Sequence, residues 1–228
     1  MFKSEVKLVI QEFVSREKLR GDSFRLLAAC FYQPQRDMFQ EGLLHDLAES
    51  LKELCPGAAD YAEEMIKLLQ VYSDEELLVD YSKLFVGPAE LLAAPYGSVY
   101  LEKERRLMGD STMAVIDFYK SRGLVMDTDF KEVPDHIAVE LEFMYYLVFK
   151  EIEAIEAKKM EEAVAALESQ EIFMTGFLRP WADKFADKMT EGAETGFYKA
   201  LAGCLSAFLY KTDIQDSLPE KLKAAAVS

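Results

Sequence analysis

The sequence predicts an all-α fold, a single globular domain that covers residues 1–228 and contains about eight to ten helices. Apolar residues recur with helical spacing through most of the chain, and no segment alternates long enough to form a convincing strand. With 228 residues, half of them hydrophobic and 12% aromatic, the chain can bury a substantial core. No internal repeat, low-complexity tract or glycine/serine linker marks a domain boundary.

The helices expected in the first part of the chain begin or end at proline, glycine or a capping motif. Ser73 and Glu76 have the spacing of a capping box, in which a serine precedes the helix and a glutamate three residues later closes its first turn. Gly87 and Pro88 then stop that helix. The expected helices cover residues up to 32, with an interruption at 21–22, then 37–54, 57–72 and 74–86.

Residues 88–110 are the least helical part of the chain and predict a loop with short helical pieces. After a polar loop at 126–133, Pro134 is expected to begin the longest helix, because the first helical position tolerates a missing N–H group. The helices expected in this part cover residues 110 or 111 to 123, 134 to 168–170, 171–189 with a break near Pro180, and 195–211.

The net charge of the chain narrows the classes of partner. The chain has 41 acidic and 26 basic residues, a net charge of −15. Phosphate backbones and anionic lipids repel such a chain, so neither nucleic acid nor stable membrane insertion is expected, and cationic partners are favoured. The longest apolar runs have seven residues, too few to span a bilayer, and the N-terminal residues lack the apolar core of a signal peptide.

The cysteine pattern points to a reduced protein. Cys30, Cys55 and Cys204 are odd in number and far apart, and no CxxC motif or Cys/His cluster is present. A metal site built from cysteines is therefore not expected. Together with the absence of a signal peptide, this pattern predicts a cytoplasmic, soluble protein.

Asp135 and His136, in the stretch EVPDHIAVELEF, are the first candidates for chemistry. They are expected in the exposed first turn of a helix, where the helix dipole disfavours an imidazolium ion. The pair then fits an acid/base couple, a recognition site or simply a helix start. Glu140 lies four residues after His136 and supplies a second ligand for a metal, but the other histidine, His45, is expected to face solvent. Two ligands do not make a metal site, so no metal is predicted. The chain also lacks a nucleophile motif, and no cofactor is predicted.

The loop after Pro88 is the second candidate. Pro95, Tyr96, Ser98 and Tyr100 bring aromatic and small polar side chains to an irregular segment. Such a segment is either a packed loop or one wall of a peptide-binding groove, because aromatic side chains supply contact area at low entropic cost.

The order of several motifs resembles one known family. The chain contains Y81-x-x-LFVGP88, then P95-Y-x-SVY100, then L107-M-G109, then E132-x-PDH136 followed by IA-x-EL-x-FM144, and finally W181-x-x-x-F185 and FY-x-x-L201. In this order they resemble the TorD-type redox enzyme maturation chaperones, which include DmsD and NarJ. The resemblance covers residues from about 23 to 209, and residues 1–19 form an N-terminal extension of unknown role.

The resemblance implies a cytoplasmic, all-helical chaperone without catalytic turnover. Such proteins bind the twin-arginine signal peptide, and often the body, of a molybdenum-cofactor oxidoreductase subunit, and they delay its export until the cofactor is inserted. Some form homodimers. The residues that the resemblance and the motifs assign to peptide binding are Tyr81, Phe85, Gly87, Pro88, Pro95, Tyr96, Ser98, Tyr100, Glu102, Asp135, His136 and Glu140.

One position departs from the family pattern, and one alternative function stays open. Many members have a histidine four residues before the tryptophan of the late helix, where this chain has Phe177. Glu102 and Glu104 add acidic groups near the loop, as binding to arginines requires. The alternative is a small all-α hydrolase or isomerase with His136 as general base.

Overall fold

The computed structural model describes residues 2–87, 91–125 and 132–211, and this part of the chain is helical, with a single isolated β-bridge between Tyr96 and His136. Two π-helical turns, at Ser82–Val86 and Met174–Leu178, and a 3-10 turn at Lys103–Arg105 connect α-helices. The α-helices are α1 (Phe2–Ala29), α2 (Arg36–Gln40), α3 (Leu43–Leu54), α4 (Pro56–Leu68), α5 (Asp74–Tyr81), α6 (Gly97–Leu101), α7 (Asp110–Ser121), α8 (Ile137–Glu156), α9 (Met160–Phe173), α10 (Arg179–Gly192) and α11 (Gly196–Lys211).

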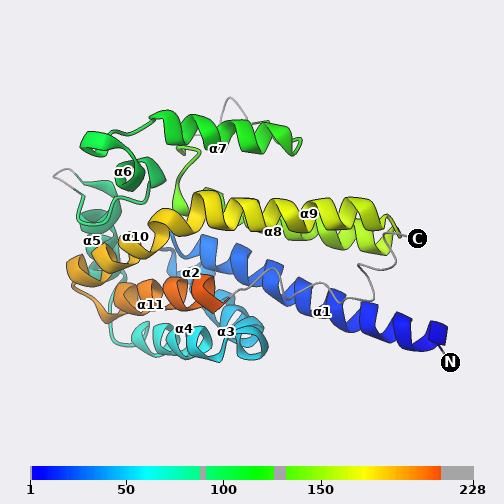
Figure 1. Cartoon of the computed structure of the whole chain (residues 1–228). Coiled ribbons are helices and arrows are strands. Elements are labelled where there is room, and N and C mark those ends of the chain that lie inside the picture. The colour runs from blue at the N-terminus through cyan, green and yellow to red at the C-terminus, as the bar shows by residue number, and fades with distance from the viewer. Residues whose placement is uncertain (1, 88–90, 126–131, 212–228) are drawn as a thin grey trace.

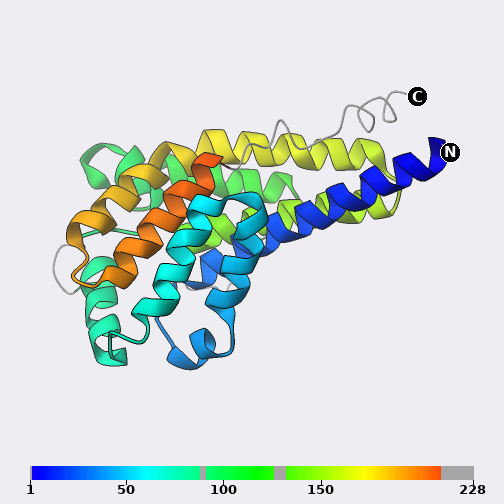
Figure 2. The same cartoon turned by 90° about the horizontal axis from the view of Figure 1, so that it is seen from below.

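Three long helices, α1, α8 and α9, lie side by side along the molecule (Figures 1 and 2). Helices α3, α4 and α11 pack together beside one end of α1, and α10 continues from α9 and packs against α11. Helix α7 lies over α8 and α9, where Tyr119 meets Phe143 with 4.4 Å between the ring centroids. One main core therefore joins the helices from both halves of the chain.

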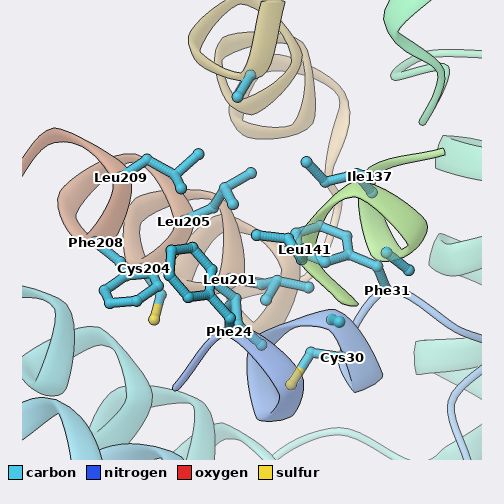
Figure 3. Close-up of a cluster of buried hydrophobic side chains, with 14 of the residues drawn as sticks. Phe24, Cys30, Phe31, Ile137, Leu141, Leu201, Cys204, Leu205, Phe208 and Leu209 are labelled. Atoms are coloured by element: carbon cyan, nitrogen blue, oxygen red, sulfur yellow. The ribbon is translucent and has the colours of Figure 1, made fainter. Parts of the chain in front are cut away.

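The main core is built where α1, α8 and α11 meet (Figure 3). Phe24 of α1 packs edge-on against Phe208 of α11, with the ring centroids 4.8 Å apart. All three cysteines are free and buried, as small apolar residues commonly are. The described part of the chain has no helix both long and apolar enough to cross a membrane.

Residues 2–19 belong to α1, and some of their side chains pack against α8 and α9. Phe13 and Val14 form a second, smaller apolar cluster with Ala154 and Ile155 of α8 and Ala163 of α9. Next to it lies a buried polar network in which the Arg20 guanidinium donates to Glu17, to Glu151 and to Gln170.

Several capping predictions are confirmed. Ser73 accepts a hydrogen bond from the Glu76 N–H group, and the Glu76 carboxylate accepts one from the Ser73 N–H group, which completes the capping box. Gly87 and Gly123 end their helical segments with φ angles of 99° and 83°, in the left-handed region that suits glycine. His45 is exposed, as expected.

Five features of the helices differ from the expectations. Helix α1 runs through residues 21–22 without a break. Gly21 lies inside the helix, where the lack of a side chain leaves space for Tyr145 and Val148 to pack closely. Gly42, with φ 107°, separates α2 from α3 inside the expected helix at 37–54. Helix α8 ends at Glu156 instead of 168–170. The chain does not break near Pro180, because the π turn at Met174–Leu178 leads directly into α10, where Pro180 lies in the first turn. The fifth difference, the start of α8, concerns the candidate site.

Candidate peptide-binding site

The two segments singled out by sequence lie against each other. The Gly97 N–H donates to the Asp135 carbonyl at 2.9 Å, and the Ile137 N–H donates to the Pro95 carbonyl at 2.9 Å. Tyr96 and His136 face each other across this single antiparallel bridge. The loop before α6 and the loop before α8 therefore form one unit, with Ser98, Asp135 and His136 inside it.

Asp135 is buried, contrary to the expectation of an exposed first helical turn. Its side chain is 1% exposed, and one carboxylate oxygen accepts the Ser98 N–H at 2.6 Å. Since Ser98 lies in the first turn of α6, Asp135 caps that short helix from another segment. The other carboxylate oxygen is buried and has no hydrogen-bond partner among the described residues.

His136 is the N-cap of α8, so the helix begins at Ile137 rather than at Pro134. The His136 Nδ1 accepts the Ala138 N–H at 3.1 Å, and the side chain is only 4% exposed. Burial lowers the pKa of His136 to about 4, and a neutral ring whose Nδ1 accepts must carry its proton on Nε2. His136 is then a hydrogen-bond donor near neutral pH, which is unfavourable for a general base.

Two half-buried tyrosines enclose the His136 ring. Tyr32 stacks on it, with centroids 6.2 Å apart and planes 10° from parallel. Tyr96 meets it edge-on at 5.4 Å. Burial is the main cause of the raised pKa of Tyr32, Tyr81 and Tyr96, and the charge of Glu132 adds to the shift of each, which places Tyr81 near the same carboxylate as the other two.

Two carboxylates complete this surface. Glu142 accepts the Tyr32 hydroxyl at 3.0 Å, and burial raises the pKa of this half-buried carboxyl. Glu132 is also partly buried. Within the described ranges, no lysine or arginine forms a salt bridge with either group. Five residues together form the tyrosine–glutamate site: Tyr32, Tyr81, Tyr96, Glu132 and Glu142.

Glu140 lies beneath this surface rather than on it. Its side chain is 1% exposed and accepts the Trp181 indole N–H at 3.1 Å. Burial raises the pKa of Glu140 well above its usual range, because the excluded water no longer stabilises the charged carboxylate. Tyr100 stacks on Trp181 at 5.7 Å, and a Cβ atom on Gly97 would lie 2.9 Å from the indole nitrogen. These residues support the site from within.

The remaining sequence candidates hold neighbouring elements in place. Glu102 accepts the Ser111 N–H at 2.6 Å and so caps α7, and this hydrogen bond lowers the pKa of Glu102. Phe85 is buried against Tyr81, with ring centroids 5.2 Å apart. Pro88 lies outside the described residues. Among those that are described, no group of three or more His, Cys, Asp or Glu residues has the geometry of a metal site.

Sequence patterns did not single out Tyr32 or Glu142, and noted Glu132 only as part of a motif. Tyr32 and Glu142 are 110 positions apart in the chain, so their hydrogen bond has no local signature. Glu142 alone of the three carried a signal, since it and Glu140 are the two charged residues in the apolar first part of α8. Phe177, at the position where many family members have histidine, packs on Phe118 and Phe173 in an aromatic cluster.

Comparisons with known proteins agree with the motif order. The family model described as nitrate reductase delta subunit matches residues 44–187. The chain is 33% identical to a chaperone protein TorD from Vibrio parahaemolyticus over 70% of its length and 72% of that protein. It is 26% identical to the Tat proofreading chaperone DmsD of Salmonella typhimurium, over 90% of the chain and 96% of DmsD.

A solved structure supports the fold. The crystal structure of a redox enzyme maturation protein from Archaeoglobus fulgidus superposes with a TM-score of 0.52 at 24% identity and covers 86% of this chain and 94% of that protein. The family match covers more than half of the sequence, and the relatives match over most of their lengths. The chain therefore belongs to the nitrate reductase delta subunit family, together with the TorD and DmsD chaperones that it was expected to resemble.

Proposed function

We propose that this chain is a cytoplasmic redox enzyme maturation chaperone that binds the twin-arginine signal peptide of a molybdenum-cofactor oxidoreductase subunit. It would retain the subunit until its cofactor is inserted and then release it for export. The chaperone names of its relatives support the general role. Binding to the body of the subunit and formation of a homodimer stay expectations from the family resemblance.

The observation that carries the proposal is the tyrosine–glutamate site. Glu132 and Glu142 are partly buried without a cationic partner among the described residues, beside aromatic rings. A guanidinium ion suits this environment in two ways, because it hydrogen-bonds a carboxylate with two N–H groups and stacks on an aromatic face. The net charge of −15 also attracts a cationic peptide.

Asp135 and His136 fix the shape of this site instead of meeting the peptide through an exposed helical turn. Asp135 holds the start of α6, and His136 holds the start of α8 while its ring supports Tyr32 and Tyr96. The site therefore combines a rigid frame with partly exposed aromatic and acidic groups, an arrangement suited to recognition. It offers no activated nucleophile, and a neutral, buried His136 does not favour the hydrolase or isomerase alternative.

Co-purification from cells tests the proposed function. The full chain, tagged, is expressed with a precursor subunit that carries a twin-arginine signal and with the same precursor in which both arginines are glutamine. We expect the tagged chain to retain the first precursor before export and to lose the second. Equal recovery of the two precursors, or recovery of neither, would contradict the proposal.

A further inference from the structure

A groove of about 450 Å³ runs between α1 and α8, away from the residues that the motifs assign. Its α8 wall is mostly apolar, and its rim carries charged groups at both helices. The residues that line it are Lys18, Gly21 and Asp22 of α1, and Tyr145, Val148, Phe149, Ile152, Glu153 and Glu156 of α8.

The close approach of the two helices at Gly21 gives the groove its floor. A Cβ atom at Gly21 would lie 3.2 Å from the Val148 Cγ1 and 3.5 Å from the Tyr145 ring. Glycine therefore leaves the apolar side chains of α8 accessible beside α1. Phe149 is the main exposed apolar residue there, with 49% of its surface accessible to solvent.

The groove lies on the face of α8 that also carries Glu142 of the tyrosine–glutamate site. Helices α1 and α8 are antiparallel, since Tyr32 hydrogen-bonds Glu142 at one end and Lys18 pairs with Glu156 at 3.2 Å at the other. Residues 142, 145, 149, 152 and 156 are spaced by three or four along α8 and so share one face. The carboxylates that suit arginine thus lie at one end of an apolar strip.

The length of this strip matches that of a particular ligand. The apolar part of the strip on α8 runs from Tyr145 to Ile152, roughly 10 Å along the helix, and Glu142 and Glu156 flank it, roughly 21 Å apart. The apolar core of a signal peptide has about 7–15 residues and is roughly 10–22 Å long when helical. The Arg25 guanidinium, 5.9 Å from the Tyr145 ring centroid, lies between the acidic end and the apolar part of the strip.

We propose that the groove between α1 and α8 binds the apolar segment of the same peptide whose arginines occupy the tyrosine–glutamate site. This inference rests on the proposed function and extends it to the orientation of the peptide. The arginines lie near Tyr32 and Glu142, and the apolar segment runs as a helix toward Lys18 and Glu156. Apolar contacts with Phe149 and Ile152 then add affinity to the charge-assisted hydrogen bonds.

Two synthetic peptides test the proposal by calorimetry with the full chain. Both begin with two arginines; one continues with a 14-residue leucine/alanine segment and the other with a serine/glycine segment of equal length. Phe149→Asp places a charge in the groove, and Ile172→Asp is a matched control, because Ile172 lies on α9 and is 48% exposed against 49% for Phe149. We expect wild type to bind the apolar peptide about tenfold more tightly than the polar one, as the burial of one large side chain allows.

The expected pattern is specific to the groove. Phe149→Asp should bind the apolar peptide about tenfold more weakly and the polar peptide unchanged, while Ile172→Asp binds both as wild type does. A benzophenone at the tenth residue after the arginines should crosslink to α8 between residues 149 and 156. If Phe149→Asp binds both peptides normally and the crosslink falls elsewhere, the groove assignment is wrong although the arginine site stands. If wild type binds neither peptide, the groove assignment and the proposed function are both wrong.

Discussion

At the scale of single residues, burial decides what His136 and Glu140 can do. Both are ionisable groups that lie almost fully inside the molecule, where the exclusion of water disfavours the charged form: burial lowers the pKa of His136 to about 4 and raises that of Glu140. Each makes one hydrogen bond that holds a neighbouring element, His136 with the start of α8 and Glu140 with Trp181 of α10.

The burial of His136 predicts a loss of stability in acid. Its pKa is about 4 in the folded protein and 6.5 when unperturbed, so the unfolded chain takes up the proton first. The free energy of unfolding should therefore fall as the pH drops from 6.5 to 4 and change no further below that, by about 3 kcal/mol in total. Buried carboxyl groups with a raised pKa make the free energy of unfolding rise as the pH drops, which opposes the effect of His136. The measurement is therefore the difference in the free energy of unfolding between wild type and His136→Asn, from urea titrations at each pH. A difference that does not depend on pH would contradict this assignment.

Glu140 is predicted to act mainly as a hydrogen-bond acceptor for Trp181, because burial disfavours its charged form. Glu140→Gln keeps an acceptor for the Trp181 indole and should change the free energy of unfolding by less than about 1 kcal/mol. Glu140→Ala leaves that N–H unpaired and opens a cavity, which should cost about 2–4 kcal/mol. Denaturant titrations of the two variants distinguish these effects, and equal losses for both would show that the charge of Glu140 is required.

At the scale of elements, the site depends on how closely the short helix α6 approaches α10. Gly97 is the point of contact, and its Cα faces the buried Trp181 ring. A methyl group there meets the indole nitrogen at 2.9 Å and its ring carbon at 3.1 Å, shorter than van der Waals contact permits.

Gly97→Ala should therefore lower stability and disturb the peptide site together. We expect a loss of about 1–3 kcal/mol in the free energy of unfolding, as overpacking typically causes, with weaker peptide binding. Gly57→Ala is the matched control, since a Cβ atom there has nothing within 4 Å. Thermal unfolding measures the stability of both variants, and calorimetry measures their peptide binding. Wild-type stability and peptide binding in Gly97→Ala would contradict the tight packing of Gly97 against Trp181.

The same scale shows which parts of the fold local sequence could predict. The capping box at Ser73, the end of the helix at Gly87 and the start of α7 near Asp110 were predictable, because each depends on neighbouring side chains or on glycine conformation. The break between α8 and α9 was not, because Lys158 adopts a φ of 61° without being glycine. Gly21 looked like a helix break, but its role is the close packing of α1 on α8.

At the scale of the whole molecule, the candidate site is assembled from segments that are far apart in the sequence. Tyr32 follows α1, Tyr81 ends α5, Tyr96 precedes α6, and Glu132 and Glu142 flank the start of α8. The motifs could predict that the loops around Tyr96 and His136 matter. They could not predict that Asp135 and His136 are buried, because burial depends on helices packed from both halves of the chain.

The N-terminal extension is predicted to stabilise the folded protein. Deleting residues 1–19 removes Phe13 and Val14 from their apolar cluster and leaves Arg20 and Glu151 without Glu17. The expected loss is about 3 kcal/mol or more in the free energy of unfolding, measured by urea titration. Phe13→Ala should show a smaller loss in the same direction. Full stability of the truncated chain would mean that the extension is independent of the domain.

The central claim is that Glu132 and Glu142 recognise arginine, and calorimetry with a peptide of two arginines and an apolar segment tests it most directly. Replacing both carboxylates by glutamine should weaken binding roughly hundredfold, since two charge-assisted hydrogen bonds are lost. The double variant Glu161→Gln/Glu168→Gln on α9 removes the same charge from exposed positions and should bind normally. Wild-type affinity in the Glu132→Gln/Glu142→Gln protein would contradict the account.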